Sequence, residues 1–384
     1  MTTVERPADT GVGVPFVDLR VQHSEVAAEV LDGFAEVLEA GDYIGGGALW
    51  SFEEEYADFA GVRHCIGVGN GTDALELALR ALGVGAGDEV VVPAATFIAT
   101  AEAVLRAGAR PVFADVDDET LLLDPHDVER VLTDRTRAVV PVDLHGQVAP
   151  FEQLPISLSD RGIAVLEDGA QSQGATRHGR RAGSFGRIAA TSFYPGKNLG
   201  AYGDGGAVLT DDDGLAEQVR LLGAHGSAVK YVHTTVGFNS RLDTLQAVVL
   251  RAKLRRLPEW NDQRREAAAR YDSLLDGIPG LRLPVTLAGN EHVWHLYVVR
   301  ITDASPVGRD EVLRRLHAEG IGAGVHYPVP VHLTPALSML GHRPGDLPVS
   351  ERAAGQMLSL PMFPGITQLQ QARVAEALSA ALGP

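Results

Sequence analysis

The sequence predicts an α/β protein in which helices cover a mostly parallel sheet, followed by a smaller C-terminal α+β domain. Between residues 51 and 211, short apolar segments of strand length alternate with segments of helical periodicity. Beyond residue 242 this alternation gives way to long helical segments and a few strands. A chain of 384 residues is too long for one small core and accommodates two domains.

The first part of the chain contains the segments that build the predicted sheet. Apolar runs at residues 89–93, 111–116, 138–144 and 164–167 have the length of strands. Nearly continuous apolar runs are typical of parallel strands that are buried on both faces. Helices are predicted among them at residues 52–60, 72–82 and 97–107, where apolar residues recur with helical spacing.

The second part of the chain begins with two long predicted helices. They span residues 242–257 and 260–275, and the first, which carries several basic residues, is suited to link two domains. A strand at 292–301, a helix at 309–319, a loop at 326–332 and a last helix at 368–382 follow. We therefore expect a flexible lead-in at residues 1–15, a large domain at 16–250 and a small domain at 251–384.

The composition argues against several classes of protein. The net charge of −17 disfavours sequence-independent nucleic-acid binding, which needs Lys and Arg to neutralise phosphates. Cys65 is the single cysteine, so no intrachain disulfide can form, no metal cluster is expected, and the thiol is predicted to be buried. The sequence has no apolar stretch of about 18 residues and no apolar segment near its start. We therefore expect neither a membrane span nor a signal peptide, and a cytoplasmic location.

The first candidate for chemistry is Lys197. It follows an apolar run and a Pro-Gly turn, and glycines at positions 200, 203, 205 and 206 come after it. Glycines allow a ligand to approach the backbone closely. An amine in a partly buried turn can lose its charge and attack a carbonyl group. From these residues alone, a solvated surface lysine is the alternative.

Two further candidates precede Lys197 in the chain. Asp168 stands at the carboxyl end of a predicted strand, where open α/β sheets bind ligands, and its carboxylate suits a protonated ring nitrogen. A helix cap or a loop acid is the alternative for this residue. Gly71 and Thr72 lie where the predicted helix at 72–82 begins, and helix N-termini attract phosphate. An ordinary Thr or Asp cap is the alternative there.

The three signals occur in the order phosphate loop, strand-end aspartate and glycine-flanked lysine. This order resembles the fold type I pyridoxal 5′-phosphate (PLP) enzymes, and within them the DegT/StrS family of sugar-nucleotide aminotransferases. The resemblance runs from about residue 16 to the C-terminus and implies an aspartate-aminotransferase-like large domain with a seven-stranded sheet. The segments that carry it are GNGTDAL (69–75), PAATF (93–97), EDGAQSQGA (167–175), SFYPGKNLGAYGDGGA (192–207) and GFNSRLD (237–243).

The resemblance implies the catalytic roles. Lys197 matches the lysine that forms a Schiff base with PLP, and Asp168 matches the partner of the pyridine nitrogen. Asn239 matches a residue that reaches the cofactor phosphate of the neighbouring subunit, which implies a homodimer with shared active sites.

The other cofactor contacts are implied in the same way. Gly71, Thr72 and Ser192 match residues that contact the cofactor phosphate. Phe97 matches an aromatic side chain that packs on one face of the ring, and Gln171 matches the side chain on the other face.

The substrate is indicated by the C-terminal part of the chain. The segments GVHYPVPVHLT (324–334) and SLPMFPG (359–365) resemble the branch of the family that acts on 3-keto-6-deoxyhexoses. His326 and Tyr327 are therefore candidate substrate contacts, with interdomain packing as the alternative. Lys230, Arg241 or His326 are candidates to help bind a diphosphate.

One segment departs from the family pattern. Asp143-Leu144-His145-Gly146 stands where the family often has His-Leu-Tyr-Gly. This difference affects the expected substrate contacts and leaves the cofactor site intact.

The resemblance thus implies transamination of a nucleotide-linked 3-keto-6-deoxyhexose, with dTDP as the expected carrier and L-glutamate as the amino donor, in deoxyamino-sugar and antibiotic biosynthesis. Amination of a 4-keto-6-deoxyhexose at C4 is the alternative. A dehydratase relative is disfavoured because such relatives replace the lysine with histidine. A regulatory relative is disfavoured because the few residues before the resemblance begins leave no room for a DNA-binding segment.

Overall fold

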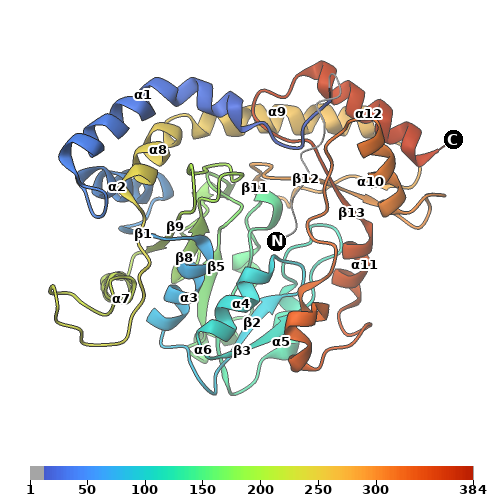
Figure 1. Cartoon of the computed structure of the whole chain (residues 1–384). Coiled ribbons are helices and arrows are strands. Elements are labelled where there is room, and N and C mark those ends of the chain that lie inside the picture. The colour runs from blue at the N-terminus through green and yellow to red at the C-terminus, as the bar shows by residue number, and fades with distance from the viewer. Residues whose placement is uncertain (1–12, 384) are drawn as a thin grey trace.

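The computed structural model describes residues 13–383, and a seven-stranded sheet lies at its centre (Figure 1). The strands of this sheet are β1 (His64–Val68), β2 (Glu89–Pro93), β3 (Arg110–Ala114), β4 (Thr136–Val139), β5 (Ala164–Asp168), β8 (Ile188–Ser192) and β9 (Gly206–Thr210). Their order is β1-β9-β8-β5-β4-β2-β3. β9 is antiparallel to both of its neighbours, and the other pairs are parallel. The expected mostly parallel sheet is confirmed.

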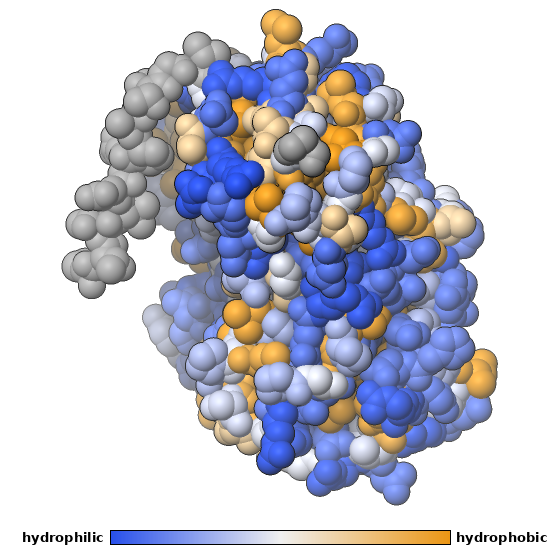
Figure 2. All heavy atoms as spheres, turned by 90° about the vertical axis from the view of Figure 1, so that its right-hand side faces the viewer, coloured by the Kyte–Doolittle hydropathy of each residue, from blue (hydrophilic) through white to orange (hydrophobic). Residues whose placement is uncertain are grey.

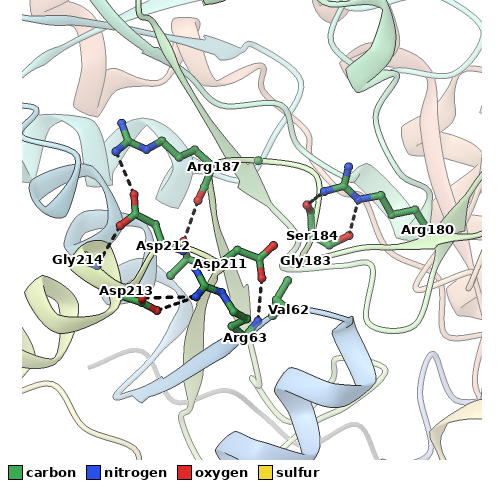
Figure 3. Close-up of a pocket in the computed structure, with 12 residues that line it drawn as sticks. Val62, Arg63, Arg180, Gly183, Ser184, Arg187, Asp211, Asp212, Asp213 and Gly214 are labelled. Carbon is green, nitrogen blue, oxygen red and sulfur yellow. Dashed lines mark hydrogen bonds and ion pairs between the residues drawn. The ribbon is translucent and has the colours of Figure 1, made fainter.

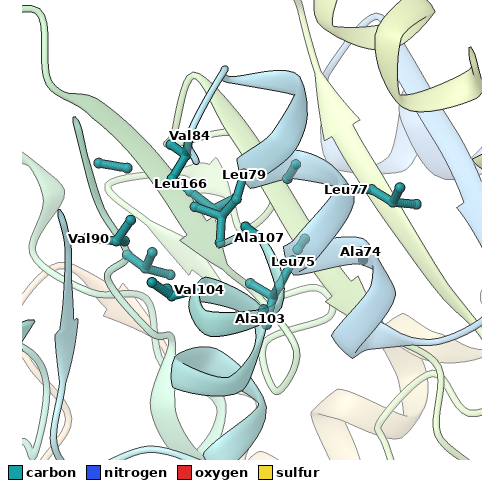
Figure 4. Close-up of a cluster of buried hydrophobic side chains, with 14 of the residues drawn as sticks. Ala74, Leu75, Leu77, Leu79, Val84, Val90, Ala103, Val104, Ala107 and Leu166 are labelled. Atoms are coloured by element: carbon teal, nitrogen blue, oxygen red, sulfur yellow. The ribbon is translucent and has the colours of Figure 1, made fainter. Parts of the chain in front are cut away.

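Helices cover both faces of the sheet. Alternate strand residues face opposite sides, and in these strands the residues on both sides are apolar and need to be buried. These helices are α2 (Gly47–Ala60), α3 (Gly71–Ala81), α4 (Ile98–Arg106), α5 (Pro125–Val131), α6 (Ser157–Asp160), α7 (Asp213–Gly223) and α8 (Thr244–Leu254). On one face, Val90 and Leu166 pack with Leu79 of α3 and Val104 of α4, as Figure 4 shows.

The opposite face has its own apolar clusters. Cys65 and Leu209 pack with residues of α2 and α8, while Val91 and Val139 pack with residues of α5 and α6. Cys65 is 2% exposed, which confirms the prediction that its thiol is buried. The fully buried central strands explain why these segments are apolar at nearly every position.

A second, antiparallel sheet follows in the C-terminal part of the chain. Its strands β10 (Leu281–Arg282), β12 (Tyr297–Ile301) and β13 (Met357–Leu360) pack with helices α9 (Leu257–Leu275), α10 (Arg309–Ala318) and α12 (Gln368–Leu382). The α9 helix contributes Trp260 to a cluster with α1 and α8 and Tyr271 to the C-terminal core. The predicted boundary at residue 250 falls within α8, and this division into domains stays a prediction.

The remaining elements are short or lie at the periphery. They are α1 (Leu19–Ala40), α11 (Pro348–Gln356), the small sheet of β6 (Thr176–Arg177), β7 (Arg180–Arg181) and β11 (Asn290–Glu291), and the 3-10 helices η1 (Leu144–Gly146), η2 (Phe151–Gln153), η3 (Val331–Leu333) and η4 (Pro335–Leu340).

Two predicted strands are too long. The strand predicted at 138–144 ends at Val139, because Pro141 has no N–H with which to continue the ladder; a single bridge between Val142 and Asp168 follows. The strand predicted at 292–301 begins at Tyr297, because Trp294 has a φ of 47°, outside the extended region.

Part of the predicted lead-in is ordered, which corrects that prediction. Val14 is 2% exposed, its N–H donates to the Gly320 carbonyl oxygen (3.0 Å), and its own carbonyl accepts from Gly322 N (2.7 Å). The prediction for residues 1–12 lies outside the described residues.

The surface beside α10, α11 and α12 is shown in Figure 2, where groups of hydrophobic residues lie among predominantly hydrophilic ones. Among residues 13–383, no helix is both long enough and apolar enough to cross a membrane.

Candidate active site

Most of the predicted site residues lie at the carboxyl ends of the parallel strands. Asp168 and Ser192 are the last residues of β5 and β8, which are adjacent and parallel. Phe97 is the N-cap of α4, which follows β2, and Gly71 is the first residue of α3, which follows β1. Because parallel strands end at one edge of the sheet, residues that are distant in sequence meet there.

The Asp168 carboxylate is buried and held by hydrogen bonds. Its Oδ2 accepts from Thr100 Oγ1 (2.8 Å), and its Oδ1 accepts from Ala170 N (3.2 Å). Burial raises the pKa of Asp168, while the Thr100 and Ala170 hydrogen bonds and the charge of Lys197 act to lower it. A cation brought against this carboxylate would favour its ionised form.

The Lys197 amine shares this environment. The residue sits in the loop after β8, where its N–H donates to the Tyr194 carbonyl oxygen (2.8 Å). Burial lowers the pKa of Lys197 to about 8, and the carboxylate of Asp168 opposes this decrease. With such a pKa, roughly a tenth of the amine is neutral at pH 7, far more than for a solvated lysine. The site therefore offers an amine with a lowered pKa whose charge interacts with that of a buried carboxylate.

The N-terminus of α3 is open to an anion. Asn70 caps the helix, since its side-chain oxygen accepts from Asp73 N (2.8 Å), so the cap is neither the threonine nor the aspartate considered above. Gly71 and Thr72 lie in the first helical turn, whose N–H groups have no partner within the helix. A Cβ on Gly71 would lie 2.6 Å from Ser192 Cβ, so only glycine allows the start of the helix to approach Ser192 so closely.

Gln171 connects two loops beside Asp168. Its Nε2 donates to Tyr327 Oη (3.2 Å), and its Oε1 accepts from His145 N (2.6 Å). The ring of Tyr327 lies 5.3 Å from the ring of Phe97, which is 50% exposed. The pKa of Tyr327 is raised by burial and by the nearby charge of Asp168. The structure thus brings Phe97, Gln171 and Tyr327 together next to Asp168.

His326 is held in place by several contacts with the protein. Its Nδ1 is hydrogen-bonded to Ser359 Oγ (2.9 Å), its ring stacks on that of Phe16 at 5.3 Å, and its carbonyl lies 3.3 Å from His145 Nε2. Burial lowers its pKa, as does the charge of Lys197. These contacts are those of a packing residue at the border of the site.

Asn239 is not brought together with the other predicted residues. Its side chain is exposed, and its oxygen accepts from Arg241 Nη2 (2.6 Å). Arg241 and Lys230 are also exposed, and Lys230 belongs to the loop after α7, which extends away from the body of the molecule (Figure 1). The neighbouring Ser240 is the residue that contacts the phosphate loop of its own chain, since its Oγ donates to Asp73 Oδ2 (2.8 Å).

Asp143, which differs from the residue that the family often has at this position, lies inside the protein. Asp143 is fully buried; its Oδ1 accepts from Ala149 N (2.9 Å) and its Oδ2 from Ser172 Oγ (2.8 Å). Burial, together with the neighbouring carboxyl of Glu167, raises its pKa. Asp143 therefore supports the loop that follows β4 from inside and is not placed to touch a substrate.

The sequence interpretation missed Thr96 and Thr100. Both are buried, and their hydroxyls are 2.9 Å apart, so they form a short chain that ends on Asp168. The sequence did contain a signal for them. Thr96 lies between the end of β2 and the start of α4, and Thr100, four residues later, lies in the first turn of α4.

A cavity of about 560 Å³ lies elsewhere (Figure 3). It is near the amino ends of β1 and β8, the opposite edge from Asp168. Four of its charged side chains form two ion pairs, Arg63 with Asp213 and Arg187 with Asp212, each at 3.1 Å. The other two are hydrogen-bonded: Arg180 Nε donates to Ser184 Oγ (3.0 Å), and Asp211 accepts from Arg63 N (2.8 Å). Because these charged groups are engaged with one another and with neighbouring residues, we assign no chemistry to this cavity.

Comparison with known proteins identifies the family of this chain. The profile of the DegT/DnrJ/EryC1/StrS aminotransferase family matches residues 24–379. The chain belongs to this family.

Similar proteins extend over nearly the whole chain. It is 48% identical over 366 residues to the dTDP-3-amino-3,4,6-trideoxy-alpha-D-glucose transaminase of Streptomyces venezuelae, covering 95% of each chain. It is 45% identical over 363 residues to the UDP-N-acetyl-3-dehydro-alpha-D-glucosamine 3-aminotransferase of Acidithiobacillus ferrooxidans, covering 94% of this chain and 96% of the other. The crystal structure of S. venezuelae DesV with a ketimine intermediate has a TM-score of 0.93 and 46% identity, and covers 97% of this chain and 99% of that one.

Aminotransferases of the DegT family depend on PLP, and this family member is therefore a PLP-dependent aminotransferase. The residues present fit the cofactor. A buried carboxylate interacts electrostatically with a lysine whose pKa is lowered to about 8, and Gly71 begins a helix whose N-terminus suits a phosphate.

Proposed function

We propose that this enzyme transfers the amino group of L-glutamate to C3 of a dTDP-linked 3-keto-6-deoxyhexose. The observation that carries the chemistry is the buried Asp168 carboxylate together with the Lys197 amine, whose charge interacts with it and whose pKa is lowered to about 8. The overall reaction converts L-glutamate to 2-oxoglutarate and the ketone of the sugar to an amine. It belongs to the biosynthesis of a deoxyamino sugar, and we assign that sugar to an antibiotic.

The residues of the site divide the binding of PLP among them. The N–H groups of Gly71 and Thr72 and the Ser192 hydroxyl hold the phosphate, which the partial positive charge of the α3 N-terminus also attracts. Phe97 and Gln171 enclose the ring, and Gln171 is fixed for this purpose by Tyr327 and His145.

Lys197 and Asp168 perform the proton chemistry. PLP, when bound, withdraws electrons from the carbon that carries the amino group. Asp168 holds the proton on the ring nitrogen, and Thr100 fixes the orientation of its carboxylate. The Lys197 amine would act as a general acid and base: it would take the proton from Cα of glutamate and deliver it to C4′ of the cofactor, and in the other half-reaction it would move a proton from C4′ to C3 of the sugar. Its pKa of about 8 suits this task, because both protonation states are populated near neutral pH.

The ring position is supported by the relatives. Both the Streptomyces and the Acidithiobacillus enzymes carry a C3 amination in their names, although one acts on a dTDP sugar and the other on a UDP sugar. These two relatives therefore share the position of amination although their nucleotides differ. The higher identity to the dTDP enzyme supports dTDP as the carrier. We assign Tyr327, whose ring lies near Phe97 and whose pKa responds to Asp168, as a contact of the sugar. His326 lines the same small cavity as Tyr327 and is the second candidate.

The substrate proposal predicts C3 amination of the 3-keto isomer. Purified enzyme with PLP and L-glutamate is given the dTDP-linked 3-keto and 4-keto-6-deoxyhexoses separately, and NMR locates the new amine. We expect the 3-keto sugar to be aminated at C3 and the 4-keto sugar to be left largely unchanged. Clean amination at C4, with the 3-keto sugar ignored, would replace this proposal with the 4-aminotransferase alternative. A shift of the cofactor absorbance on adding glutamate alone separates both from a regulatory protein without turnover.

We also infer a homodimer with shared active sites. Asn239 is exposed, outside the site of its own chain, and the loop that precedes it exposes apolar side chains. In this loop Tyr231 is 82% exposed and Val236 is 90% exposed, which is unusual for side chains of this kind in a monomer. A second copy of the chain covers this surface in our proposal, and Asn239 reaches the cofactor phosphate of that copy.

Subunit mixing tests this arrangement. Lys197→Ala and Asn239→Ala subunits are each expected to be poorly active, whereas their heterodimer contains one intact site. Random exchange should restore about a quarter of wild-type activity, because half of the dimers are mixed and half of their sites are complete. The matched control mixes Lys197→Ala with Asp168→Asn. Those two residues belong to the same chain of each site, so no intact site forms. Equal activity of both mixtures after proven exchange would refute the shared site.

A further inference from the structure

The loop that carries Lys197 is tightly closed. Lys197 N donates to the Tyr194 carbonyl, and Ala201 N donates to the Phe193 carbonyl, both at 2.8 Å. A Cβ on Gly200 would overlap the carbonyl group of Pro195, so the two ends of the turn are in contact. The position of the Lys197 side chain therefore depends on what holds Gly200.

Lys253, on α8, holds Gly200. Its Nζ donates to the Gly200 carbonyl oxygen at 2.6 Å and lies 4.6 Å from the centre of the Tyr202 ring. The residue is only 3% exposed, and within residues 13–383 no carboxylate lies within ion-pair distance of its ammonium group. Burial lowers the pKa of Lys253 to about 8. A buried ammonium without a carboxylate is costly, which argues that it is kept for a purpose.

The choice of lysine supports this argument. The chain has 33 basic residues, and only Lys197, Lys230 and Lys253 are lysines. The other Lys or Arg positions are all arginine, whose larger planar group suits surface ion pairs. A compact ammonium fits between one carbonyl oxygen and the face of an aromatic ring.

The turn after Gly200 is held from two helices. Tyr202 N donates to Gln246 Oε1 of α8 (2.8 Å), and Tyr202 Oη is hydrogen-bonded to His23 Nδ1 of α1 (2.6 Å). The contact with Lys253 differs from these, because it acts on the residue in contact with Pro195, inside the loop that bears Lys197.

We propose that Lys253 is a positioning residue for the transamination: its ammonium group fixes the Gly200 carbonyl and thereby the position of the Lys197 amine. This inference rests on the proposed role of Lys197. A proton transfer is sensitive to such placement, since a displacement of about 1 Å can cost a hundredfold in rate. Loss of the Lys253 contact should therefore slow the chemistry more than it weakens binding of the amino acid.

The test compares PLP-loaded Lys253→Met with Arg251→Met. Arg251 lies on the same helix, but it pairs with Glu55 near the surface, so its variant controls for loss of a positive charge on α8. The rate of the glutamate half-reaction is followed by rapid absorbance changes, and the pKa of the cofactor chromophore is found by absorbance titration. We expect at least about a tenfold slower Lys253→Met half-reaction, a KM for glutamate within about twofold of wild type, and a chromophore pKa shifted by about half a unit or more.

The control should match wild type in both readouts. If Lys253→Met equals Arg251→Met in rate and in chromophore pKa, the proposal is overturned. A lower melting temperature of Lys253→Met would not rescue it, because a purely structural role of Lys253 would change the melting temperature alone. If the Met variant does not fold, Lys253→Gln, which keeps a neutral donor, decides by the same criteria with an expected slowing of about threefold or more. The glutamate half-reaction uses no sugar, so failure of the sugar assignment leaves this test intact. Failure of the Lys197 assignment would show instead in the Lys197→Ala variant.

Discussion

Replacing Lys197 with alanine is expected to abolish turnover and to remove the absorbance of the covalent lysine–cofactor adduct. The variant removes the amine whose charge interacts with Asp168, and with it the group that moves the proton at Cα of glutamate. The fold should persist, because Lys197 forms no ion pair within residues 13–383 and the loop is held by backbone hydrogen bonds and Lys253. Steady-state assays and circular dichroism measure the two expectations separately.

Chemical labelling identifies the lysine directly. Borohydride reduction of the PLP enzyme followed by peptide mapping should place the label on Lys197. The chain has only two other lysines, Lys230 and Lys253, which makes the result unambiguous. Lys230→Ala serves as the control, since Lys230 lies on the exposed loop after α7 and should leave the adduct absorbance unchanged. A label on Lys230 or Lys253 would be incompatible with the assignment.

The strands β2, β3, β4 and β5 of the central sheet were predictable because their signals are local, whereas β1, β8 and β9 were not among the strands predicted from the apolar pattern. The strands predicted at 89–93 and 164–167 are continuous apolar runs, and the helices predicted at 72–82 and 97–107 have helical periodicity. The structure places all four within one or two residues of the prediction. The limits of the other strands were not local. The end of β4 depends on Pro141, and the start of β12 depends on the backbone conformation of Trp294, which an apolar pattern does not encode.

The site itself was predictable where residues follow strand ends. Asp168, Ser192 and Phe97 owe their proximity to parallel strands that end at one edge, which is a property of the fold class. Contacts between distant segments had no such signal. The hydrogen bond of Gln171 with Tyr327 joins residues 156 apart in sequence, and that of Lys253 with Gly200 joins residues 53 apart. Side-chain packing in three dimensions decides these pairs.

Asp168→Asn should retain PLP but lose most of the activity. The amide fills the same space and can still accept a hydrogen bond from Thr100, so the pocket should remain intact. It cannot offer a negative charge to a protonated ring nitrogen, and the electron-withdrawing power of the cofactor then falls. Losing a charge-stabilising contact of this kind costs about 3 kcal/mol of barrier, which corresponds to roughly a hundredfold in rate.

The burial of Asp168 explains why the expected loss of activity is large. Water cannot replace the lost charge at a residue that is 4% exposed, whereas it would at a surface carboxylate. The matched control is Asp211→Asn. Asp211 accepts a hydrogen bond from Arg63 N at the opposite edge of the sheet, so its variant removes one negative charge without touching the site. We expect the control to keep nearly full activity and the Asp168 variant to show a kcat lower by roughly a hundredfold or more with PLP still bound. Near-normal turnover of Asp168→Asn would show that another group keeps the ring nitrogen protonated, and the role assigned to this carboxylate would have to be withdrawn.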